Sequence, residues 1–283
     1  MKIIECPRDA MQGLKGFIPT DLKIQYINQL LRVGFDTIDF GSFVSPKAIP
    51  QLADTAEVLA GLDLQGTHTK LLAIIANVRG ATEAVSHQEI TYLGYPLSLS
   101  ETFQQRNTNR SIDDAFNDLE TIQSLCETNK KTLVVYLSMG FGNPYGDPYE
   151  LDYVGEFVER LMVMKVKIIS LADTIGVSNP ENITSLFSSL IPKFPEVEFG
   201  AHLHSTMETS REKIHAAFKA GCRRMDGAIN GFGGCPMAED TLVGNMATEH
   251  MVAYFGSYDH EIYLNKREFE VAMNMAPSVF LGR

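Results

Sequence analysis

The sequence contains no tryptophan, only four cysteines, and no apolar run near the roughly 20 residues needed to cross a bilayer. The cysteines form neither a Cys-x-x-Cys pair nor a small disulfide framework; they are Cys6, Cys126, Cys222 and Cys235. We therefore expect free thiols in a reducing compartment. The first residues also lack the pattern of a secretory signal peptide. These absences favour a cytoplasmic protein with no membrane partner.

Positive charge is scarce as well. The chain has 24 Lys and Arg against 35 Asp and Glu, for a formal net charge of −11. Because phosphate binding needs concentrated Lys and Arg, we expect no nucleic-acid partner. The hydrophobic fraction of 45% is sufficient for one large barrel or two ordinary domains. No linker or low-complexity tract divides the chain, which favours a single catalytic domain over residues 1–283.

Short β-like runs alternate with amphipathic helical stretches along the chain. The runs typical of strands are Lys2–Cys6, Thr37–Phe40, Lys70–Ala76, Glu89–Leu93, Thr132–Leu137, Lys167–Leu171, Val197–Leu203 and Arg224–Ile229. This succession of βα units predicts an α/β fold, a (β/α)8 TIM barrel. A doubly wound sheet is the alternative, and the missing Gly-rich fingerprint after the first strand argues against it.

Capping residues mark where the helices between these strands begin. Predicted helix starts lie at Thr20, Ser111 and Asn179, the last followed by a proline suited to the first helical position. The segments Leu31–Asp39 and Phe218–Asp226 echo each other. Each predicts a helix end, a glycine in the left-handed conformation, and a strand that ends in aspartate.

In a TIM barrel, the active site forms at the carboxyl ends of the strands and in the loops that follow them. Polar side chains occupy several of these predicted ends: Arg8 and Asp9 after the first strand, Asp39 on the second, Asp173 on the sixth, and His202 and His204 on the seventh. They are far apart in sequence, yet the barrel would bring them to one mouth.

The pair His202 and His204 is the sharpest signal among them. Residues i and i+2 of a strand face the same side, so two imidazoles near Asp9 could bind a divalent cation. A hydrogen-bonded pair of histidines is the alternative. Asn245 could add an amide oxygen, or it could be an ordinary asparagine at a helix start. Mixed nitrogen and oxygen ligation is compatible with Mg²⁺, Mn²⁺, Fe²⁺ or Zn²⁺.

Two further side chains suit chemistry beside such a cation. Arg8 stays charged and can donate two hydrogen bonds to a carboxylate or an enolate oxygen. A salt bridge from Arg8 to Asp9 or Asp39 is the alternative. Cys235 follows three glycines within four residues, and a loop cysteine can act as acid or base if its pKa falls. The alternative for Cys235 is a buried small hydrophobe.

Five motifs occur in one order along the chain and carry a family resemblance. They are Pro-Arg-Asp-x-x-Gln from residue 7, Ser-Phe-Val-Ser-Pro-Lys from residue 42, Asp-Thr-Ile-Gly-Val from residue 173, His-x-His from residue 202 and Gly-x-Gly-Gly-Cys-Pro from residue 231. Together the motifs resemble the 3-hydroxy-3-methylglutaryl-CoA lyases of the DRE-TIM metallolyase superfamily. The resemblance runs from about residue 2 to residue 253.

The resemblance implies a metal-dependent retro-Claisen cleavage of 3-hydroxy-3-methylglutaryl-CoA to acetyl-CoA and acetoacetate. The implied ligands of Mg²⁺ or Mn²⁺ are Asp9, His202, His204 and Asn245. The implied catalytic residues are Arg8, Cys235, His202, Asp39 and Asp173. In this scheme Arg8 stabilises the acetyl-CoA enolate and Cys235 handles its proton. The resemblance also implies an acyl-CoA substrate and a homodimer.

The chain departs from the family pattern at several positions, among them four that bear on the site. Ser205 follows the second histidine in place of Asp, Asp39 replaces a Glu, Asn143 replaces a Cys, and Glu5 is one residue closer to the arginine. A one-residue slip on a strand turns a side chain to the other face, so we leave Glu5 out of the catalytic set. The departures leave a second hypothesis open: a related metallolyase that acts on another acyl-CoA, or on a 2-oxo acid by retro-aldol cleavage or Claisen condensation. A barrel that binds metal or acyl-CoA without turnover is the third.

Overall fold

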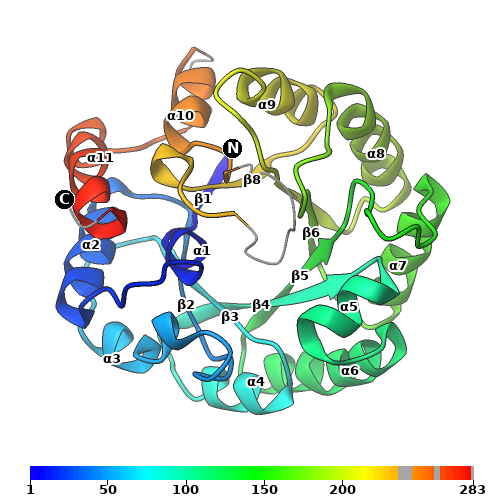
Figure 1. The fold of residues 1–283 in the computed structure, drawn as a ribbon, viewed down its shortest axis with the longest axis horizontal. Coiled ribbons are helices and arrows are strands. Elements are labelled where there is room, and N and C mark those ends of the chain that lie inside the picture. The colour runs from blue at the N-terminus through cyan, green and yellow to red at the C-terminus, as the bar shows by residue number, and fades with distance from the viewer. Residues whose placement is uncertain (235–243, 258–261, 282–283) are drawn as a thin grey trace.

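Eight parallel strands close into a barrel in chain order, and β1 pairs with both β2 and β8 (Figure 1). This computed structural model describes residues 1–234, 244–257 and 262–281. The strands are β1 (Lys2–Glu5), β2 (Thr37–Ser42), β3 (Lys70–Ile74), β4 (Ile90–Ser98), β5 (Thr132–Ser138), β6 (Ile168–Ala172), β7 (Glu198–His202) and β8 (Arg224–Gly227). The (β/α)8 barrel predicted from the sequence is confirmed.

The helices surround the barrel on its outer side, except the short helix α1 (Pro7–Gln12), which lies inside the ring of the others (Figure 1). The others are α2 (Thr20–Val33), α3 (Thr55–Ala60), α4 (Val78–Val85), α5 (Glu101–Thr108), α6 (Ile112–Thr128), α7 (Leu151–Val163), α8 (Pro180–Lys193), α9 (Ser210–Lys219), α10 (Thr248–Gly256) and α11 (Lys266–Phe280). Two 3₁₀ turns, η1 (Pro50–Leu52) and η2 (Ile229–Gly231), join them. Within the described ranges, no helix combines the length and apolar character needed to cross a membrane.

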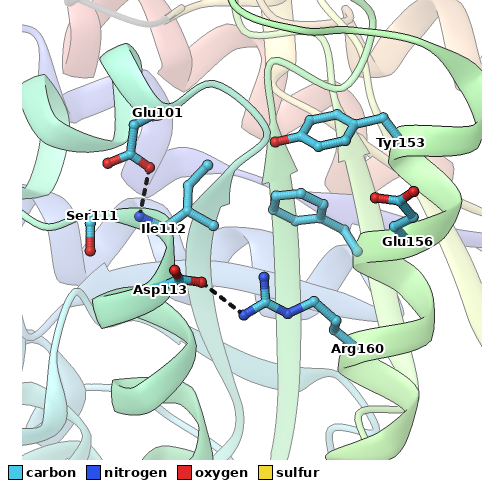
Figure 2. A pocket seen from close by; sticks show the side chains of 8 residues that line it. Glu101, Ser111, Ile112, Asp113, Tyr153, Glu156 and Arg160 are labelled. Atoms are coloured by element: carbon cyan, nitrogen blue, oxygen red, sulfur yellow. Dashed lines mark hydrogen bonds and ion pairs between the residues drawn. The ribbon is translucent and has the colours of Figure 1, made fainter.

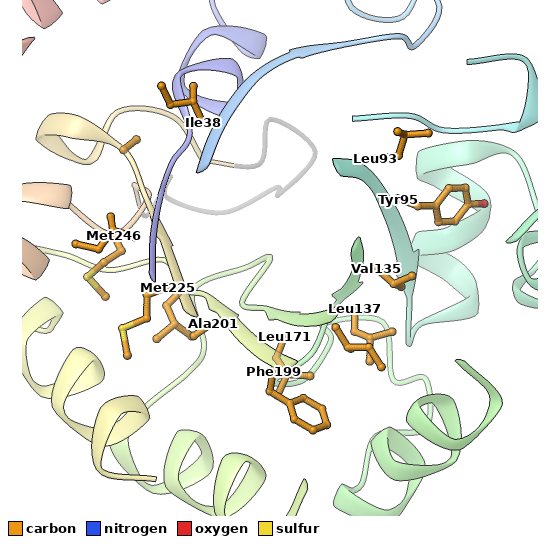
Figure 3. Packing of buried hydrophobic residues seen from close by; sticks show 14 of the residues in the cluster. Ile38, Leu93, Tyr95, Val135, Leu137, Leu171, Phe199, Ala201, Met225 and Met246 are labelled. Atoms are coloured by element: carbon orange, nitrogen blue, oxygen red, sulfur yellow. The ribbon is translucent and has the colours of Figure 1, made fainter. Parts of the chain in front are cut away.

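The buried core has two parts, a shell between strands and helices and the inside of the barrel. Figure 3 shows part of the shell, where side chains such as Val135 and Leu171 point from the strands toward the helices. The inside contains a smaller apolar cluster of Leu72, Tyr92, Val134, Tyr136 and Ile168. Neighbours such as Val134 and Val135 belong to different parts because side chains alternate along a strand. This alternation decides which residues face the barrel axis.

Two of the predicted helix starts are confirmed as capping boxes. The Ser111 hydroxyl accepts from the Asp114 amide at 3.0 Å, and the Asn179 side chain accepts from the Asn182 amide at 3.0 Å. The glycine of the first echoed segment, Gly34, also takes the expected left-handed conformation, with φ of 85°. Local sequence therefore determines these boundaries.

The prediction that Thr20 caps α2 is wrong in detail. Helix α2 begins at Thr20 itself, and Pro19 is the N-cap. The Thr20 hydroxyl instead donates to the Asp54 carboxylate at 2.8 Å. A partner distant in sequence has thus replaced the local cap.

Strand β4 runs five residues beyond its predicted end, through Pro96 to Ser98. Pairing with β3 stops at Gly94, which aligns with Ile74, while pairing with β5 continues to Ser98. Pro96 therefore lies past the end of β3, where the N–H that proline lacks has no strand to bond. A proline at such a one-sided position does not end a strand.

Candidate active site

The first strand leads directly into the short helix α1, which carries Arg8 and Asp9. Pro7 takes the first helical position, and β1 ends two residues earlier. The sequence placed Arg8 and Asp9 just after the first strand, and in the structure they lie in a six-residue helix. Both Arg8 and Asp9 are buried. Asp9 lies in the first turn, where the helix dipole favours a negative charge.

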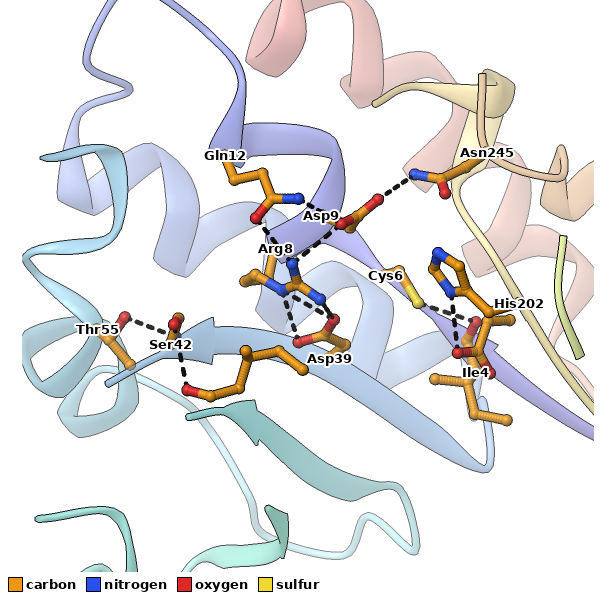
Figure 4. A network of polar contacts seen from close by, with 12 residues as sticks. Ile4, Cys6, Arg8, Asp9, Gln12, Asp39, Ser42, Thr55, His202 and Asn245 are labelled. Atoms are coloured by element: carbon orange, nitrogen blue, oxygen red, sulfur yellow. Dashed lines mark hydrogen bonds and ion pairs between the residues drawn. The ribbon is translucent and has the colours of Figure 1, made fainter. Parts of the chain in front are cut away.

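Arg8 is the centre of a buried network of ion pairs (Figure 4). Its Nε donates to Asp39 Oδ2 at 2.9 Å, and its Nη1 donates to Asp9 Oδ1 and Gln12 Oε1, each at 3.0 Å. Burial alone would lower the pKa of Arg8, but the negative charges of Asp39 and Asp9 outweigh this effect and raise the pKa. The salt bridges from Arg8 to Asp9 and to Asp39, which were the alternative to a catalytic role, are therefore both present. They hold the guanidinium group in a fixed orientation.

The Asp39 carboxyl belongs to the same network on β2. It is 1% exposed. Burial raises the pKa of Asp39 to about 6, and the neighbouring Arg8 charge offsets only part of that effect. Asp39 therefore reaches Arg8 despite being one methylene shorter than a glutamate.

Asp9 connects this network to the segment that follows β8, the strand beside β1. Its Oδ1 accepts from Gln12 Nε2 at 2.6 Å, and its Oδ2 accepts from Asn245 Nδ2 at 2.7 Å. Burial would raise the pKa of Asp9, but the positive charge of Arg8 and the nearby His202 lower it below its ordinary value. Asp9 is thus an ionised carboxylate that faces both histidine and asparagine.

His202 occupies the last position of β7 and pairs with Asp226 on β8. Its Nδ1 lies 3.1 Å from Asp226 Oδ2, and because a carboxylate only accepts, Nδ1 carries the proton. Burial lowers the pKa of His202, but the hydrogen bond and charge of Asp226 outweigh it and raise the pKa. Nε2 is therefore the ring nitrogen that a metal ion could bind after displacing its proton, as in carboxylate–histidine–metal arrangements.

His204 lies beyond the end of β7, so the prediction that both histidines are on one strand is wrong. His204 instead forms an isolated antiparallel bridge with Asn245. The two histidine rings are nevertheless 5.7 Å apart. Burial and the charge of His202 lower the pKa of His204 to about 4, which makes it a neutral imidazole near pH 7.

The types of donor atom at this end of the barrel suit a divalent cation. They belong to Asp9, His202, His204 and Asn245. This set offers a carboxylate, two imidazoles and an amide, which suit Mg²⁺ or Mn²⁺ as well as softer metals. Asn245 now presents its NH₂ to Asp9, and a half-turn of the amide would present its oxygen. Asn245 hydrogen-bonds Asp9, and both histidines affect the pKa of Asp9, so the four residues assigned from the sequence lie at the same end of the barrel.

Cys6, His202 and Asp226 form a second, tighter group, with ligand atoms all within 4.8 Å of one another. Burial and the negative charge of Asp226 raise the pKa of Cys6 well above its ordinary value, so this thiol stays protonated. His202 also uses its Nδ1 for Asp226 in this group. Since a metal needs the thiolate, the group around Asp9 is the better cation site.

Asp173 lies at the end of β6 but is tied into a network of its own. Its Oδ1 accepts from the Ser178 amide at 3.0 Å, and its Oδ2 lies 3.4 Å from Lys213 Nζ. The same Lys213 Nζ donates to the His204 carbonyl at 2.7 Å. Asp173 therefore contacts the histidine segment through Lys213 rather than facing Arg8.

Three residues of the site, Asp226, Lys213 and Gln12, had no role predicted from the sequence. Asp226 ends the segment Phe218–Asp226, in the position that Asp39 has in the similar segment Leu31–Asp39. This similarity indicated that Asp226 also lies at the end of a strand. Lys213 interrupts the apolar face of α9, a sign of a buried partner. Gln12 is the last residue of the first motif, and nothing else in the sequence indicated that it contacts Arg8 and Asp9.

Cys235 lies outside the described residues, and the loop just before it is close to the site. A Cβ at Gly233 would lie 2.8 Å from Ala10 Cα and 2.9 Å from the Asp9 carbonyl oxygen. Gly233 also has φ of 92°. Only glycine fits there, so the chain that leads toward Cys235 passes directly beside Asp9.

Three departures from the family pattern have structural roles. The Glu5 carboxylate accepts from the Ile229 amide at 2.9 Å and the Thr248 hydroxyl at 2.6 Å, away from the Arg8 network. Asn143 Oδ1 accepts two backbone amides within the loop after β5. Ser205 Oγ contacts the sulfur of Met246 at 3.4 Å.

A separate hollow lies between α5, α6 and α7 (Figure 2). Three of its charged side chains already have partners: Arg160 is 3.1 Å from Asp113, and Glu101 accepts from the Ile112 amide at 2.9 Å. No titratable group assigned to the site lines this hollow.

Similarity to known proteins agrees with the geometry at the barrel mouth. A cytoplasmic 3-hydroxy-3-methylglutaryl-CoA lyase of Rattus norvegicus is 34% identical over 255 residues, which cover 89% of this chain and 73% of the relative. A hydroxymethylglutaryl-CoA lyase of Bacillus subtilis is 34% identical over 246 residues, covering 87% of this chain and 81% of the relative.

The fold is shared with a solved structure of an HMG-CoA lyase from Acinetobacter baumannii, in complex with coenzyme A and 3-methylmalate. It superposes with a TM-score of 0.91 at 30% identity and covers 99% of this chain and 91% of the other. The profile of the family described as HMGL-like matches residues 2–272. The chain belongs to the HMGL-like family.

Proposed function

We propose that this protein is a metal-dependent carbon–carbon lyase that cleaves 3-hydroxy-3-methylglutaryl-CoA to acetyl-CoA and acetoacetate. The observation that carries the proposal is the convergence of the Arg8–Asp39 pair and the Asp9, His202 and His204 group at one end of the barrel. Membership of the HMGL-like family, over residues 2–272, supports the same reaction.

In this proposal, Asp9, His202, His204 and Asn245 hold a divalent cation, Mg²⁺ or Mn²⁺. A bound cation supplies Lewis acidity, which makes the 3-hydroxyl of the substrate easier to deprotonate. The protein's part is to present an ionised Asp9 and two imidazole rings at the same end of the barrel. Asp226 serves this purpose by keeping the proton of His202 on Nδ1.

The bond that breaks joins C2 and C3 of the substrate. The 3-hydroxyl releases its proton to solvent and becomes the ketone of acetoacetate, while the C2–C3 electron pair moves into the acetyl-CoA enolate, which takes up one proton at C2 in turn. Arg8 stabilises that enolate because its guanidinium is held by Asp39 and needs little reorganisation. Cys235, on the glycine loop, returns a proton to C2. Asp173 supports the site through Lys213 and the His204 carbonyl.

The substrate and the assembly follow from the same family. The Acinetobacter baumannii relative has coenzyme A bound, and we assign an acyl-CoA partner to this chain. A homodimer and a cytoplasmic location are part of the proposal. Light scattering of the purified protein tests the dimer, with a mass of one 31.4 kDa chain as the contrary result.

The experiment that tests the function measures acetoacetate formed from 3-hydroxy-3-methylglutaryl-CoA with added Mg²⁺ or Mn²⁺. We expect turnover that EDTA stops. A parallel assay of retro-aldol cleavage uses a panel of 2-oxo acids, because Asp39 and Asn143 change the surroundings of the site. Turnover of a 2-oxo acid alone would assign the chain to another metallolyase activity. A metal-loaded protein inactive on every substrate would be a binding protein.

A further inference from the structure

The barrel interior contains a row of side chains at one level, below the histidines. Tyr136, Ser170, Gly200 and Arg224 are register partners across β5, β6, β7 and β8. Two residues further along, the next level holds His202, which is the partner of Asp226. Because side chains at i and i+2 share a face, these two levels are stacked along the barrel axis.

Arg224 is the unusual member of this row. It is 0% exposed. Among the described residues, none of its three side-chain nitrogens has a hydrogen-bond partner. Its Nη1 is 3.8 Å from Glu198 Oε1, too far for a hydrogen bond, and its guanidinium is 5.4 Å from the Tyr92 ring centroid. A buried guanidinium with no partner for its donors is strongly unfavourable.

Three more buried polar atoms around it share this condition. Within the part of the chain that the structure describes, Tyr136 Oη, Ser170 Oγ and Asp226 Oδ1 also make no hydrogen bond. Gly200 keeps space between two of these side chains. A Cβ there would lie 2.9 Å from Ser170 Oγ and 3.2 Å from Arg224 Cδ.

The chemistry of these atoms restricts what can satisfy them. Arg224 only donates hydrogen bonds, and the Asp226 carboxylate only accepts them. An anion that carries no proton could accept from Arg224 but could not donate to Asp226, and a metal cation cannot accept a hydrogen bond from Arg224. Water does both, and buried polar cavities commonly hold water with two to four partners.

We propose that ordered water inside the barrel bridges Arg224 to Asp226, with Ser170 and Tyr136 as further partners, and that Arg224 thereby acts as a positioning residue for His202. Asp226 Oδ2 orients the His202 ring at 3.1 Å, and the bridge holds the other carboxylate oxygen, Oδ1. Both oxygens of the Asp226 carboxylate are then held, and the His202 ring is oriented with Nε2 toward the proposed cation site. The second half of this inference rests on the proposed function, and the first half does not.

A high-resolution crystal structure of the metal-free wild-type protein tests the water directly. We expect water density within hydrogen-bonding distance of both the Arg224 guanidinium and Asp226 Oδ1. A dry interior, a direct Arg224–Asp226 ion pair, or density for an ion in that place would overturn the proposal. This outcome does not depend on whether the protein is a lyase.

Titration with Mn²⁺ by calorimetry tests the positioning role. Arg224→Met keeps the chain volume and removes the donors, and we expect Mn²⁺ affinity to fall by about 10–100-fold, the usual effect of losing a residue that supports a ligand. Arg224→Lys, which still donates to water, should lose less. Arg223→Met is the matched control, because Arg223 bonds the Phe218 and Cys222 carbonyls instead.

A folded Arg224→Met protein with wild-type Mn²⁺ affinity would refute the positioning role. If Arg224→Met does not fold, Tyr136→Phe and Ser170→Ala replace it, with a weaker Mn²⁺ affinity expected for each and an unchanged affinity for both as the contrary result. Wild-type protein that binds no Mn²⁺ would contradict the proposed function, and the crystallographic test of the water would still stand.

Discussion

Arg8 Nε donates to Asp39 Oδ2 at 2.9 Å, and this contact joins the carboxyl ends of β1 and β2. The same guanidinium holds Asp9 at 3.0 Å. One side chain therefore connects the proposed enolate site to the proposed cation site. The arrangement gives Arg8 a fixed orientation before substrate arrives, which is the condition for effective stabilisation of developing charge.

The first prediction concerns this arginine. Arg8→Gln should fold with a lower free energy of unfolding, because the buried Asp39 loses its counter-ion. It should still bind Mn²⁺, since removing a positive charge near Asp9 does not weaken a cation site. Turnover of 3-hydroxy-3-methylglutaryl-CoA should fall by about 10²–10³-fold, the usual loss for one donor to a developing oxyanion. Steady-state kinetics measure kcat, with Arg32→Gln on the exposed side of α2 as the control. Near-wild-type kcat in Arg8→Gln would remove Arg8 from the mechanism.

The second prediction concerns the cation. EDTA should abolish activity, and Mg²⁺ or Mn²⁺ should restore it. His204→Ala should lower Mn²⁺ affinity by more than the about 10–100-fold typical of a supporting residue, because a ligand itself is lost. Calorimetry measures the affinity, and His68→Ala, an exposed histidine, is the control. Full activity after dialysis against EDTA would exclude a cation from the reaction.

How far the sequence could predict this site depends on the kind of residue. Arg8, Asp9, Asp39 and His202 follow from topology, because any side chain at a strand's carboxyl end reaches the barrel mouth. Their partners do not follow. The pairing of Asp226 with His202 depends on the register of β7 and β8, which sets which residues lie opposite each other.

Two positions show why strand boundaries were less predictable. His204 follows an unbroken β-like run, yet β7 ends at His202 because the chain turns to bridge Asn245, 41 residues later. Pro96 looks like a strand breaker, yet β4 continues because β3 has already ended. In both cases the neighbouring strand decides the boundary, and it is not visible locally.

A third prediction concerns Lys213, which sequence analysis did not assign. Its ammonium bonds the His204 carbonyl at 2.7 Å and faces Asp173 at 3.4 Å, with both side chains buried. Lys213→Met leaves a buried carboxylate without its counter-ion, so the free energy of unfolding should fall by about 3–5 kcal/mol. Urea denaturation measures it, and Lys219→Met, exposed at the end of α9, should change little. A loss no larger than that control would show that Ser178 alone satisfies Asp173.

The last prediction concerns Glu5, whose carboxyl is 1% exposed and accepts from Ile229 and Thr248. Burial raises the pKa of Glu5 from 4.5 to about 8 in the folded protein. The unfolded chain releases this proton near pH 4.5, whereas the folded chain keeps it until about pH 8. The folded state thus binds more protons in this window, and its stability falls as the pH rises through it.

Glu5→Gln imitates the protonated acid at every pH, since its amide oxygen can accept from Ile229 and its nitrogen can donate to Thr248. The difference in unfolding free energy between variant and wild type should therefore rise from pH 5 to pH 8, by at most about 1.4 kcal/mol for each pH unit. It should then level off. Urea denaturation at each pH measures this difference, and the exposed Glu83→Gln should give a flat line. A flat line for Glu5→Gln as well would mean that Glu5 is ionised in the folded protein, stabilised by its two donors.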